Sequence, residues 1–319
     1  MAVRIAGVVN TLNEAHNIRY ALSTLLPWCD DVVVVDQNST DGTAEIAREM
    51  GARVFQHEWT GGIGDAARAF AVAQAQADRV LILDADEMIP PALARYLREQ
   101  ASAEDSPDVL LVPRVNVIMG RIMRHGTNWP SRRARFFRPG CVEISGRIHH
   151  GLKARPDALV REVPARPELA IWHFSYPDVR TVVEKVNRYT TIEAEQALSR
   201  GELPPRSARP FLGSAARWFW GSYVRDNGYR DGTAGLVLAV SRAYYRFLRA
   251  AKMWEQPRAA ERERQVRAVR ERLVAAHGGG QRLVEGHAEG ARLDAYPPPE
   301  PSVAAPSADA RSADPAFPE

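Results

Sequence analysis

The sequence has few cysteines, little net charge and no long apolar run. Its 319 residues include two cysteines, Cys29 and Cys141, which form neither a disulfide framework nor a metal-ligand spacing, so a reducing cytosol is expected. The formal net charge of +3 is too small to indicate nucleic-acid binding by itself. No apolar run approaches the roughly 20 residues of a membrane span. We therefore expect a soluble or peripheral protein.

Two nucleotide-binding signatures and a secretion signal are also missing. Neither GxxxxGKS nor GxxxxGKT occurs, so the chain does not resemble a P-loop protein. The loop after the first predicted strand lacks GxGxxG, which argues against a dinucleotide-binding oxidoreductase. The first residues, MAVRIAGVVNTLNEA, begin directly as a strand, without the basic region and cleavage site of a signal peptide. These features predict a cytoplasmic protein.

Strands and helices alternate through the first hundred residues. The composition, 45% hydrophobic and 25% charged, is that of an ordinary globular protein. Short runs rich in Val, Ile and Leu predict buried strands at residues 3–9, 32–35, 53–56 and 80–83. Helical spacing predicts helices at residues 15–26, 43–50 and 66–77. This order predicts an α/β fold, with a mostly parallel sheet, right-handed connections and helices on its faces.

An acidic cluster follows the strand at residues 80–83. Asp84, Asp86 and Glu87 stand at the carboxyl end of this strand, where open α/β sheets bind ligands. Such carboxylates repel one another unless a cation or hydrogen-bond donors lie among their oxygens. Asp-x-Asp suits a hard divalent ion such as Mg²⁺ or Mn²⁺. An isolated Asp-x-Asp would more simply be a solvated turn, and the preceding segments favour the metal-binding interpretation.

Three segments together resemble a known family. NTLNEA follows the first predicted strand, VVVVDQNSTDGT contains the second, and LILDADE contains the fourth. In order and placement they resemble a family 2 glycosyltransferase with a GT-A fold. The resemblance implies a nucleotide diphosphate sugar, most simply a UDP-sugar, bound at the carboxyl edge of the sheet. The second segment departs from the usual Asp-Asp-Gly-Ser by reading Asp36-Gln37-Asn38-Ser39, but it keeps the first acid.

The resemblance also implies roles for individual residues. Asp36 would hydrogen-bond the base, and Asp84 would contact the ribose or the metal. Asp86 would ligate a Mg²⁺ or Mn²⁺ ion that bridges the diphosphate, and Arg68 would contact the diphosphate. The nucleoside pocket would be lined by Thr11, Asn13 and Glu14. Asn13 and Glu14 can equally act as helix caps at this strand-to-helix turn.

The general base is left open among three residues. An inverting transfer needs one base near the acceptor hydroxyl. Relatives often carry Val-His-Glu where this chain reads Ile148-His149-His150, so His150 stands in place of the Glu. Glu143, His149 and His150 are the candidates. His173 resembles the family's downstream His, which can approach the metal or the diphosphate, although a lone His in an apolar strand is more often structural.

Basic residues alternate along residues 132–138, which predicts a strand. One interpretation is a solvated edge strand, whose charges oppose aggregation. The other is a strand that helps to hold phosphates of the donor or the acceptor.

Aromatic and basic residues recur at helical spacing beyond the acidic cluster. Residues 178–199 predict a helix capped by Asp178, and two more helical patterns follow up to residue 255. These helices either pack on the catalytic domain or a partner subunit, or lie at a membrane interface. The segments NRYTTIEAE, FWGSYVRDNGYRDGTAGL and AAKMWE resemble the branch of the family that contains the lipopolysaccharide core β-glucosyltransferases.

The sequence thus predicts three parts and one activity. Residues 1–176 form the catalytic domain, 177–255 a helical acceptor or membrane-interface extension, and 256–319 a charged helix with a disordered tail. The predicted activity is inverting transfer of a hexose to a cell-envelope glycan or lipid-linked acceptor, in the cytoplasm or on the inner face of the cytoplasmic membrane. The alternatives are a non-catalytic nucleotide-sugar-binding or scaffold protein, and a glycosyltransferase acting on a peptide or soluble acceptor.

Overall fold

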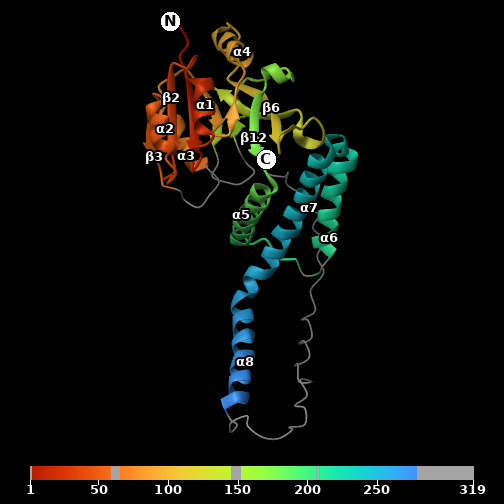
Figure 1. The fold of residues 1–319 in the computed structure, drawn as a ribbon. Coiled ribbons are helices and arrows are strands. Elements are labelled where there is room, and N and C mark those ends of the chain that lie inside the picture. The colour runs from red at the N-terminus through yellow and green to blue at the C-terminus, as the bar shows by residue number, and fades with distance from the viewer. Residues whose placement is uncertain (1, 59–64, 145–151, 206, 208, 279–319) are drawn as a thin grey trace. The chain divides into compact units, whose positions relative to one another are not determined.

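The computed structural model describes residues 2–58, 65–144, 152–205, 207 and 209–278. The chain divides into two compact units, with the boundary between Trp254 and Glu255. The first unit contains a large sheet with helices on its faces and a helical segment after it (Figure 1). Residues 279–319, including the predicted tail, lie outside the described residues.

The first half of the sheet consists of parallel strands joined by helices, namely β1 Ile5–Thr11, α1 Ile18–Leu25, β2 Asp31–Asp36, α2 Thr43–Glu49, β3 Arg53–Gln56, α3 Asp65–Gln74 and β4 Arg79–Asp84. β1 lies between β2 and β4, and β3 pairs with β2, all in parallel. Gly51 ends α2 with a φ of +93°, a left-handed conformation that glycine adopts without strain. The predicted alternation of strands and helices is confirmed.

The second half of the sheet is mixed, and its elements are β5 Glu87–Met88, α4 Pro91–Ser102, β6 Val109–Ile118, β7 Arg121–Ile122, β8 Ser131–Phe137, β11 Val160–Glu162 and β12 Ile171–Tyr176. β8 lies inside the sheet, antiparallel to both β4 and β6. The interpretation of residues 132–138 as a solvated edge strand is therefore wrong. Phe136 and Phe137 on this strand are buried, and core packing on both faces outweighs its basic composition.

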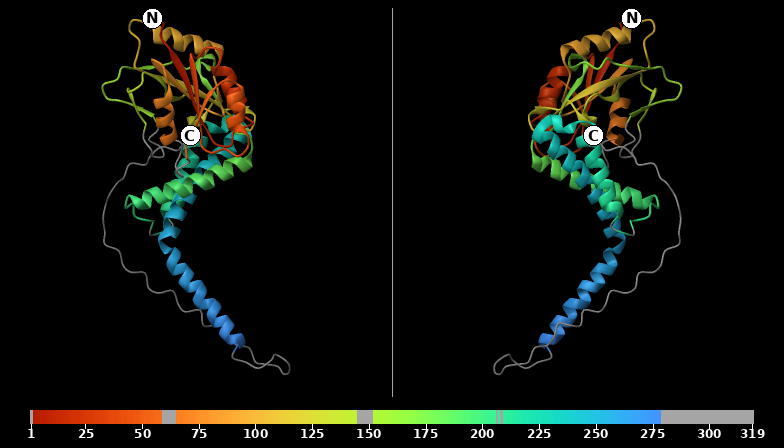
Figure 2. Two further views of the ribbon diagram at one scale, coloured as in Figure 1. Left: turned by 90° about the vertical axis from the view of Figure 1, so that its left-hand side faces the viewer. Right: turned by 90° about the vertical axis from the view of Figure 1, so that its right-hand side faces the viewer.

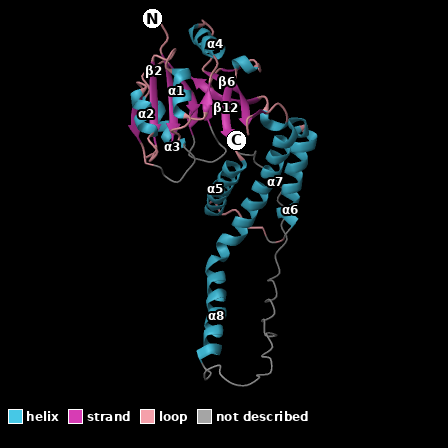
Figure 3. Cartoon of the chain, viewed as in Figure 1, coloured by secondary structure: helices cyan, strands magenta, loops and turns pink. Residues whose placement is uncertain are grey.

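Short elements complete this unit, namely the 3₁₀ turns Gly126–Asn128, Pro167–Leu169 and Gly228–Asp231, and a two-stranded sheet of β9 Val142–Ile144 and β10 Leu152–Ala154. The main sheet has apolar side chains on both faces. α1, α2 and α4 contribute to the core on one face, and α3 contributes to the core on the other. The turned views of Figure 2 and the cartoon of Figure 3 show this layered arrangement.

Three long helical elements follow the sheet, namely α5 Val179–Ser199, α6 Arg209–Phe219, which continues as a π-helical segment Trp220–Arg225, and α7 Gly232–Glu255. Asp178 caps α5, as predicted, by accepting a hydrogen bond from the Thr181 N–H at 2.7 Å. α7 packs Ala234 and Leu238 against Ile118 and Met123. The helical segment therefore adjoins the end of β6, on the same edge as the candidate site.

The second unit contains a 3₁₀ turn, Gln256–Arg258, and the helix α8 Ala259–Gly278. α8 carries exposed Arg and Glu side chains that pair along its length, for example Arg264 with Glu261. Within the described residues, no helix combines the length and the apolar character that crossing a membrane requires.

Candidate active site

Polar turns meet at the carboxyl ends of three adjacent strands. β4 ends at Asp84, β2 ends at Asp36, and β1 ends at Thr11 between them. The register places Asn10 beside Asp84 and Thr11 beside Asp36. The acidic cluster and the polar turns after β1 and β2 are therefore neighbours, as the parallel arrangement predicted.

Asp84 is held by two arginines. Its Oδ1 accepts a hydrogen bond from Arg68 at 2.7 Å, and its Oδ2 accepts one from Arg135 at 2.7 Å. Burial alone would raise the pKa of Asp84, but the charges and hydrogen bonds of Arg135 and Arg68 outweigh it and hold the pKa well below its ordinary value. Asp84 is thus an anchored carboxylate, and Arg68 reaches it from α3.

A buried ion-pair network lies directly behind the turn. Glu87 is fully buried, and its Oε1 lies 3.0 Å from Arg135 and 3.4 Å from Arg114. Its other oxygen accepts a hydrogen bond from the Asp84 backbone N–H at 2.8 Å. Because Arg135 joins Glu87 to Asp84, the network fixes the conformation of the acidic turn.

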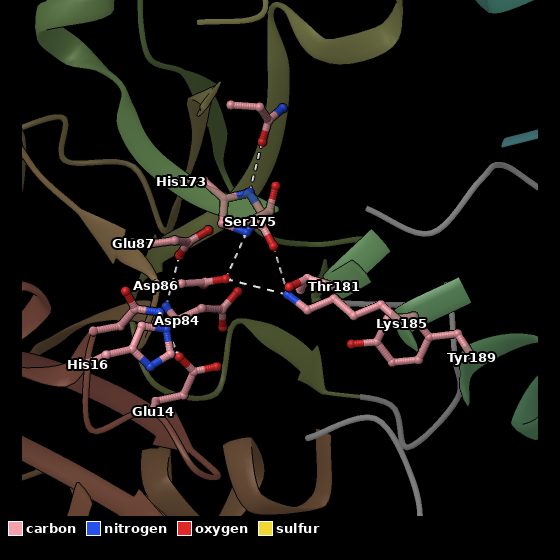
Figure 4. Close-up of polar contacts among 12 residues, drawn as sticks. Glu14, His16, Asp84, Asp86, Glu87, His173, Ser175, Thr181, Lys185 and Tyr189 are labelled. Atoms are coloured by element: carbon pink, nitrogen blue, oxygen red, sulfur yellow. Dashed lines mark hydrogen bonds and ion pairs between the residues drawn. The ribbon is translucent and has the colours of Figure 1, made fainter. Parts of the chain in front are cut away.

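Asp86 has longer contacts than Asp84. Its Oδ2 lies 3.5 Å from Nε2 of His173 and 3.8 Å from Nζ of Lys185, and Figure 4 shows both groups pointing toward it. Burial raises the pKa of Asp86, but the proximity of His173 and Lys185 outweighs this effect and lowers it. The Asp86 carboxylate is therefore ionised, and it faces two basic side chains beyond ideal hydrogen-bonding distance.

His173 is oriented from behind by a second polar side chain. Its Nδ1 lies 2.8 Å from Oδ1 of Asn116 on β6, and both residues are buried. Since an amide oxygen can only accept, Nδ1 carries the proton and Nε2 is the nitrogen that faces Asp86. Asn116 in turn donates to the Asn128 carbonyl at 3.2 Å.

Two buried oxygens lie at the ends of β1 and β2. Asp36 accepts a hydrogen bond at Oδ2 from the Ser39 N–H, 3.0 Å away, while its Oδ1 has no partner among the described residues. Oγ1 of Thr11 likewise has none among them. Buried acceptors without donors are rare, so this corner of the sheet can take a hydrogen-bond donor from a ligand.

The turn after β1 is braced against the turn after β2. Asn13 has a left-handed φ of 55°, and its Oδ1 accepts from the Thr40 N–H at 2.9 Å. The Glu14 N–H donates to Thr43, and the Glu14 carboxylate accepts from Asn17. Burial raises the pKa of Glu14, with a further contribution from the charge of Asp86, while the Asn17 hydrogen bond opposes the rise.

The candidate bases lie in or beside a part of the chain that is not described. Glu143 is exposed on β9, opposite Lys153 in the two-stranded sheet. His149 and His150 lie outside the described residues. The choice among these three residues stays a prediction.

The sequence analysis did not single out three residues that contribute to the site around the acidic turn. Arg135 belongs to the basic strand that the sequence indicated, but its pairing with Asp84 depends on β8 lying beside β4. No sequence pattern singled out Asn116 or Lys185 as a site residue, since Asn116 lies in an apolar strand and Lys185 in a regular helix. Only the packing of β6, β12 and α5 brings them to the acidic turn.

The donor set at Asp86 fits a divalent cation. A carboxylate oxygen and an imidazole nitrogen face each other at 3.5 Å, and the imidazole is fixed through its other nitrogen, as in known metal-binding histidines. Among the described residues, no group of three His, Cys, Asp or Glu side chains could hold an ion. Oxygen atoms of a bound diphosphate would therefore be needed to complete the coordination.

Comparison with known proteins identifies related sequences. The model of the family described as glycosyl transferase family 2 matches residues 8–154. A lipopolysaccharide core biosynthesis glycosyltransferase of Rhizobium meliloti is 27% identical over 259 residues, which cover 79% of this chain and 92% of the relative. An uncharacterised glycosyltransferase of Rickettsia bellii is 27% identical over 268 residues, covering 79% of this chain and 86% of the relative.

A solved structure with a similar substructure is glucosyl-3-phosphoglycerate synthase from Mycobacterium tuberculosis, in complex with Mn²⁺, UDP and glucosyl-3-phosphoglycerate. The sequence identity is 23% and the TM-score is 0.31. The match covers 35% of this chain and 44% of the mycobacterial chain, so it spans less than half of that enzyme.

Proposed function

Residues 8–154 match the model of glycosyl transferase family 2, and from this premise we propose that the chain transfers a hexose from a nucleotide diphosphate sugar to an acceptor of the cell envelope. It is a transferase with a GT-A fold and resembles lipopolysaccharide core biosynthesis enzymes. The observation that carries the proposal is the contrast between the two aspartates. Asp84 is tied to Arg68 and Arg135, whereas Asp86 faces His173 with capacity to coordinate an ion.

The donor is a UDP-sugar in this proposal. Asp36 binds the base, because its buried Oδ1 requires a donor and a uracil ring supplies an N–H. Thr11, Asn13 and Glu14 form the wall of the nucleoside pocket, and Asn13 does so by fixing the turn at Thr40. Arg68 pairs with Asp84 and, in this proposal, adds positive charge beside the diphosphate.

Asp86 and His173 are the residues that hold a Mg²⁺ or Mn²⁺ ion in this proposal, with Asp84 next to them. Such an ion, when bound, stabilises the negative charge of the departing diphosphate. Asn116 keeps Nε2 of His173 directed at Asp86, and the ion pairs of Arg135 keep the turn in place. The chain thus contributes a rigid anionic turn, in which the carboxylate of Asp86 is available to bind the ion.

Transfer proceeds with inversion in this proposal, through a single displacement at the anomeric carbon. The acceptor hydroxyl loses its proton to a general base, for which Glu143, His149 and His150 remain the candidates. The bond between the sugar and the terminal phosphate breaks, and its electron pair stays on the phosphate oxygen.

The acceptor is a lipid-linked or envelope glycan in this proposal, reached at the inner face of the cytoplasmic membrane. The surface of α7 supports this, since it exposes large apolar side chains at helical spacing, Leu236, Val240, Tyr244, Phe247 and Trp254. The helix buries Arg242 and Arg246 on its other side. Exposed basic residues of α6 and of the turns between α6 and α7 suit an anionic surface, namely Arg209, Arg217, Arg225 and Arg230.

A vesicle assay tests the acceptor. We expect labelled hexose from a UDP-hexose to float with vesicles of envelope lipids that carry a lipid-linked glycan, in a bond of the opposite anomeric configuration. Val240→Glu should reduce flotation of the protein because it places a charge on the exposed α7 face, while Tyr20→Glu, at an exposed position of α1, should leave it unchanged. Label found only in a peptide or soluble metabolite would overturn the envelope acceptor.

A further inference from the structure

A lysine from the helical segment reaches the acidic turn. Lys185 lies in the second turn of α5, and its Nζ is 3.8 Å from Oδ2 of Asp86 (Figure 4). α5 begins after residue 154, where the match to the family model ends, so that match assigns no role to this side chain. Because Asp178 and Thr181 fix the start of the helix, the direction from which Lys185 approaches is set by the fold.

Among the described residues, Lys185 has few contacts for a half-buried ammonium group. Nζ donates one hydrogen bond to the Ser175 carbonyl at 3.0 Å and lies 5.2 Å from the centre of the Tyr176 ring. Lys252 is a useful contrast, since its Nζ donates to Asn187, Thr190 and Thr191 over 2.6 to 2.9 Å. Lys252 therefore ties α7 to α5, whereas Lys185 keeps hydrogen-bonding capacity that faces the turn.

The other cations at the turn are already paired. Arg135 contacts both Asp84 and Glu87 within 3.0 Å, and Arg68 contacts Asp84 at 2.7 Å. These guanidinium groups balance the charges of the carboxylates that they hold. Lys185 instead approaches Asp86 at a distance too long for a hydrogen bond. Its ammonium group can therefore donate a hydrogen bond to a more strongly charged anion that binds nearby.

The chemistry of the reaction supplies such an anion. When the bond between the sugar and the terminal phosphate breaks, the electron pair stays on the phosphate oxygen, and the leaving diphosphate carries one more negative charge than it did in the donor. One additional positive charge at this position stabilises the transition state more than the ground state. An ammonium group on a flexible stem suits this task.

We propose that Lys185 is a catalytic residue whose Nζ–H donates to the terminal phosphate of the nucleoside diphosphate and neutralises the charge that develops there. This inference rests on the proposed function. It makes α5 part of the donor site, so the catalytic site combines the sheet edge with the helical segment.

The test compares Lys185→Gln, Lys185→Arg and the control Arg188→Gln, which removes a charge from an exposed residue one turn further along α5. UDP and UMP affinities are measured calorimetrically with Mn²⁺, together with turnover of the UDP-sugar. Lys185→Gln should weaken UDP binding about 10- to 100-fold, the usual value of a hydrogen bond to a charged group. UMP binding should not change, because UMP lacks the terminal phosphate.

Turnover of Lys185→Gln should fall at least as much as UDP affinity, Lys185→Arg should restore part of both, and Arg188→Gln should match the wild type. Unchanged UDP affinity and turnover in Lys185→Gln would overturn the role, as would equal weakening of UDP and UMP. If the folded wild type binds neither nucleotide, the proposed function itself fails, and this outcome is distinct from a wild type that binds UDP independently of Lys185.

Discussion

Replacing Asp86 with Asn should lower the turnover of the UDP-sugar by about 10³-fold or more, since metal-assisted charge stabilisation contributes several kcal/mol to such reactions. Asn keeps the shape of the side chain but loses the charge that faces His173 and Lys185. The measurement is steady-state transfer at saturating donor and Mn²⁺, with a thermal unfolding curve on the same sample.

Asp105→Asn is the matched control, because Asp105 is an exposed carboxylate that pairs with Arg161 away from the turn. It should leave turnover unchanged. The Asp86 variant should still fold, since the contacts of its carboxylate are 3.5 Å or longer. A folded Asp86→Asn protein with wild-type turnover would remove Asp86 from the chemistry.

Replacing Arg135 with Ala should reduce the free energy of unfolding by about 3–5 kcal/mol, the cost of leaving buried charges without their partner. Arg135 is buried and contacts Asp84 at 2.7 Å and Glu87 at 3.0 Å. Chemical denaturation followed by circular dichroism measures the loss.

Arg138→Ala gives the comparison for Arg135, since Arg138 follows β8 directly and forms an exposed ion pair with Asp108. A surface pair of this kind contributes about 0–1 kcal/mol. Equal losses of stability in the two variants would contradict the view that the buried network behind the acidic turn holds the site together.

Local patterns were sufficient for the strands and helices of the first half of the fold. The apolar runs at residues 32–35, all valine, and 80–83, Val-Leu-Ile-Leu, form β2 and β4, because uninterrupted β-branched and apolar residues suit a strand buried on both faces. The helix capped by Asp178 was likewise predicted from local sequence patterns. The helix predicted at residues 66–77 ends earlier, at Gln74, before the polar residues that precede β4. The glycosyltransferase and GT-A predictions are confirmed.

Contacts between residues far apart in the chain could not be predicted from the sequence. Nothing local indicates that residues 131–137 enter the sheet between β4 and β6, and this pairing converts Arg135 from a surface charge into a buried partner of Asp84. The same holds for Lys185, which lies 99 positions after Asp86 in the chain and meets it only through the packing of α5 beside β12. The donor, the ion and the base remain predictions.

The role of Asp86 in metal-dependent binding of the donor is tested most directly by a calorimetric titration of the wild type and Asp86→Ala with UDP, GDP and TDP, with and without Mn²⁺. We expect that UDP binds the wild type, that binding depends on Mn²⁺, and that Asp86→Ala loses it. A folded wild type that binds none of the three nucleotides, or binds UDP equally without the ion and in Asp86→Ala, would contradict it.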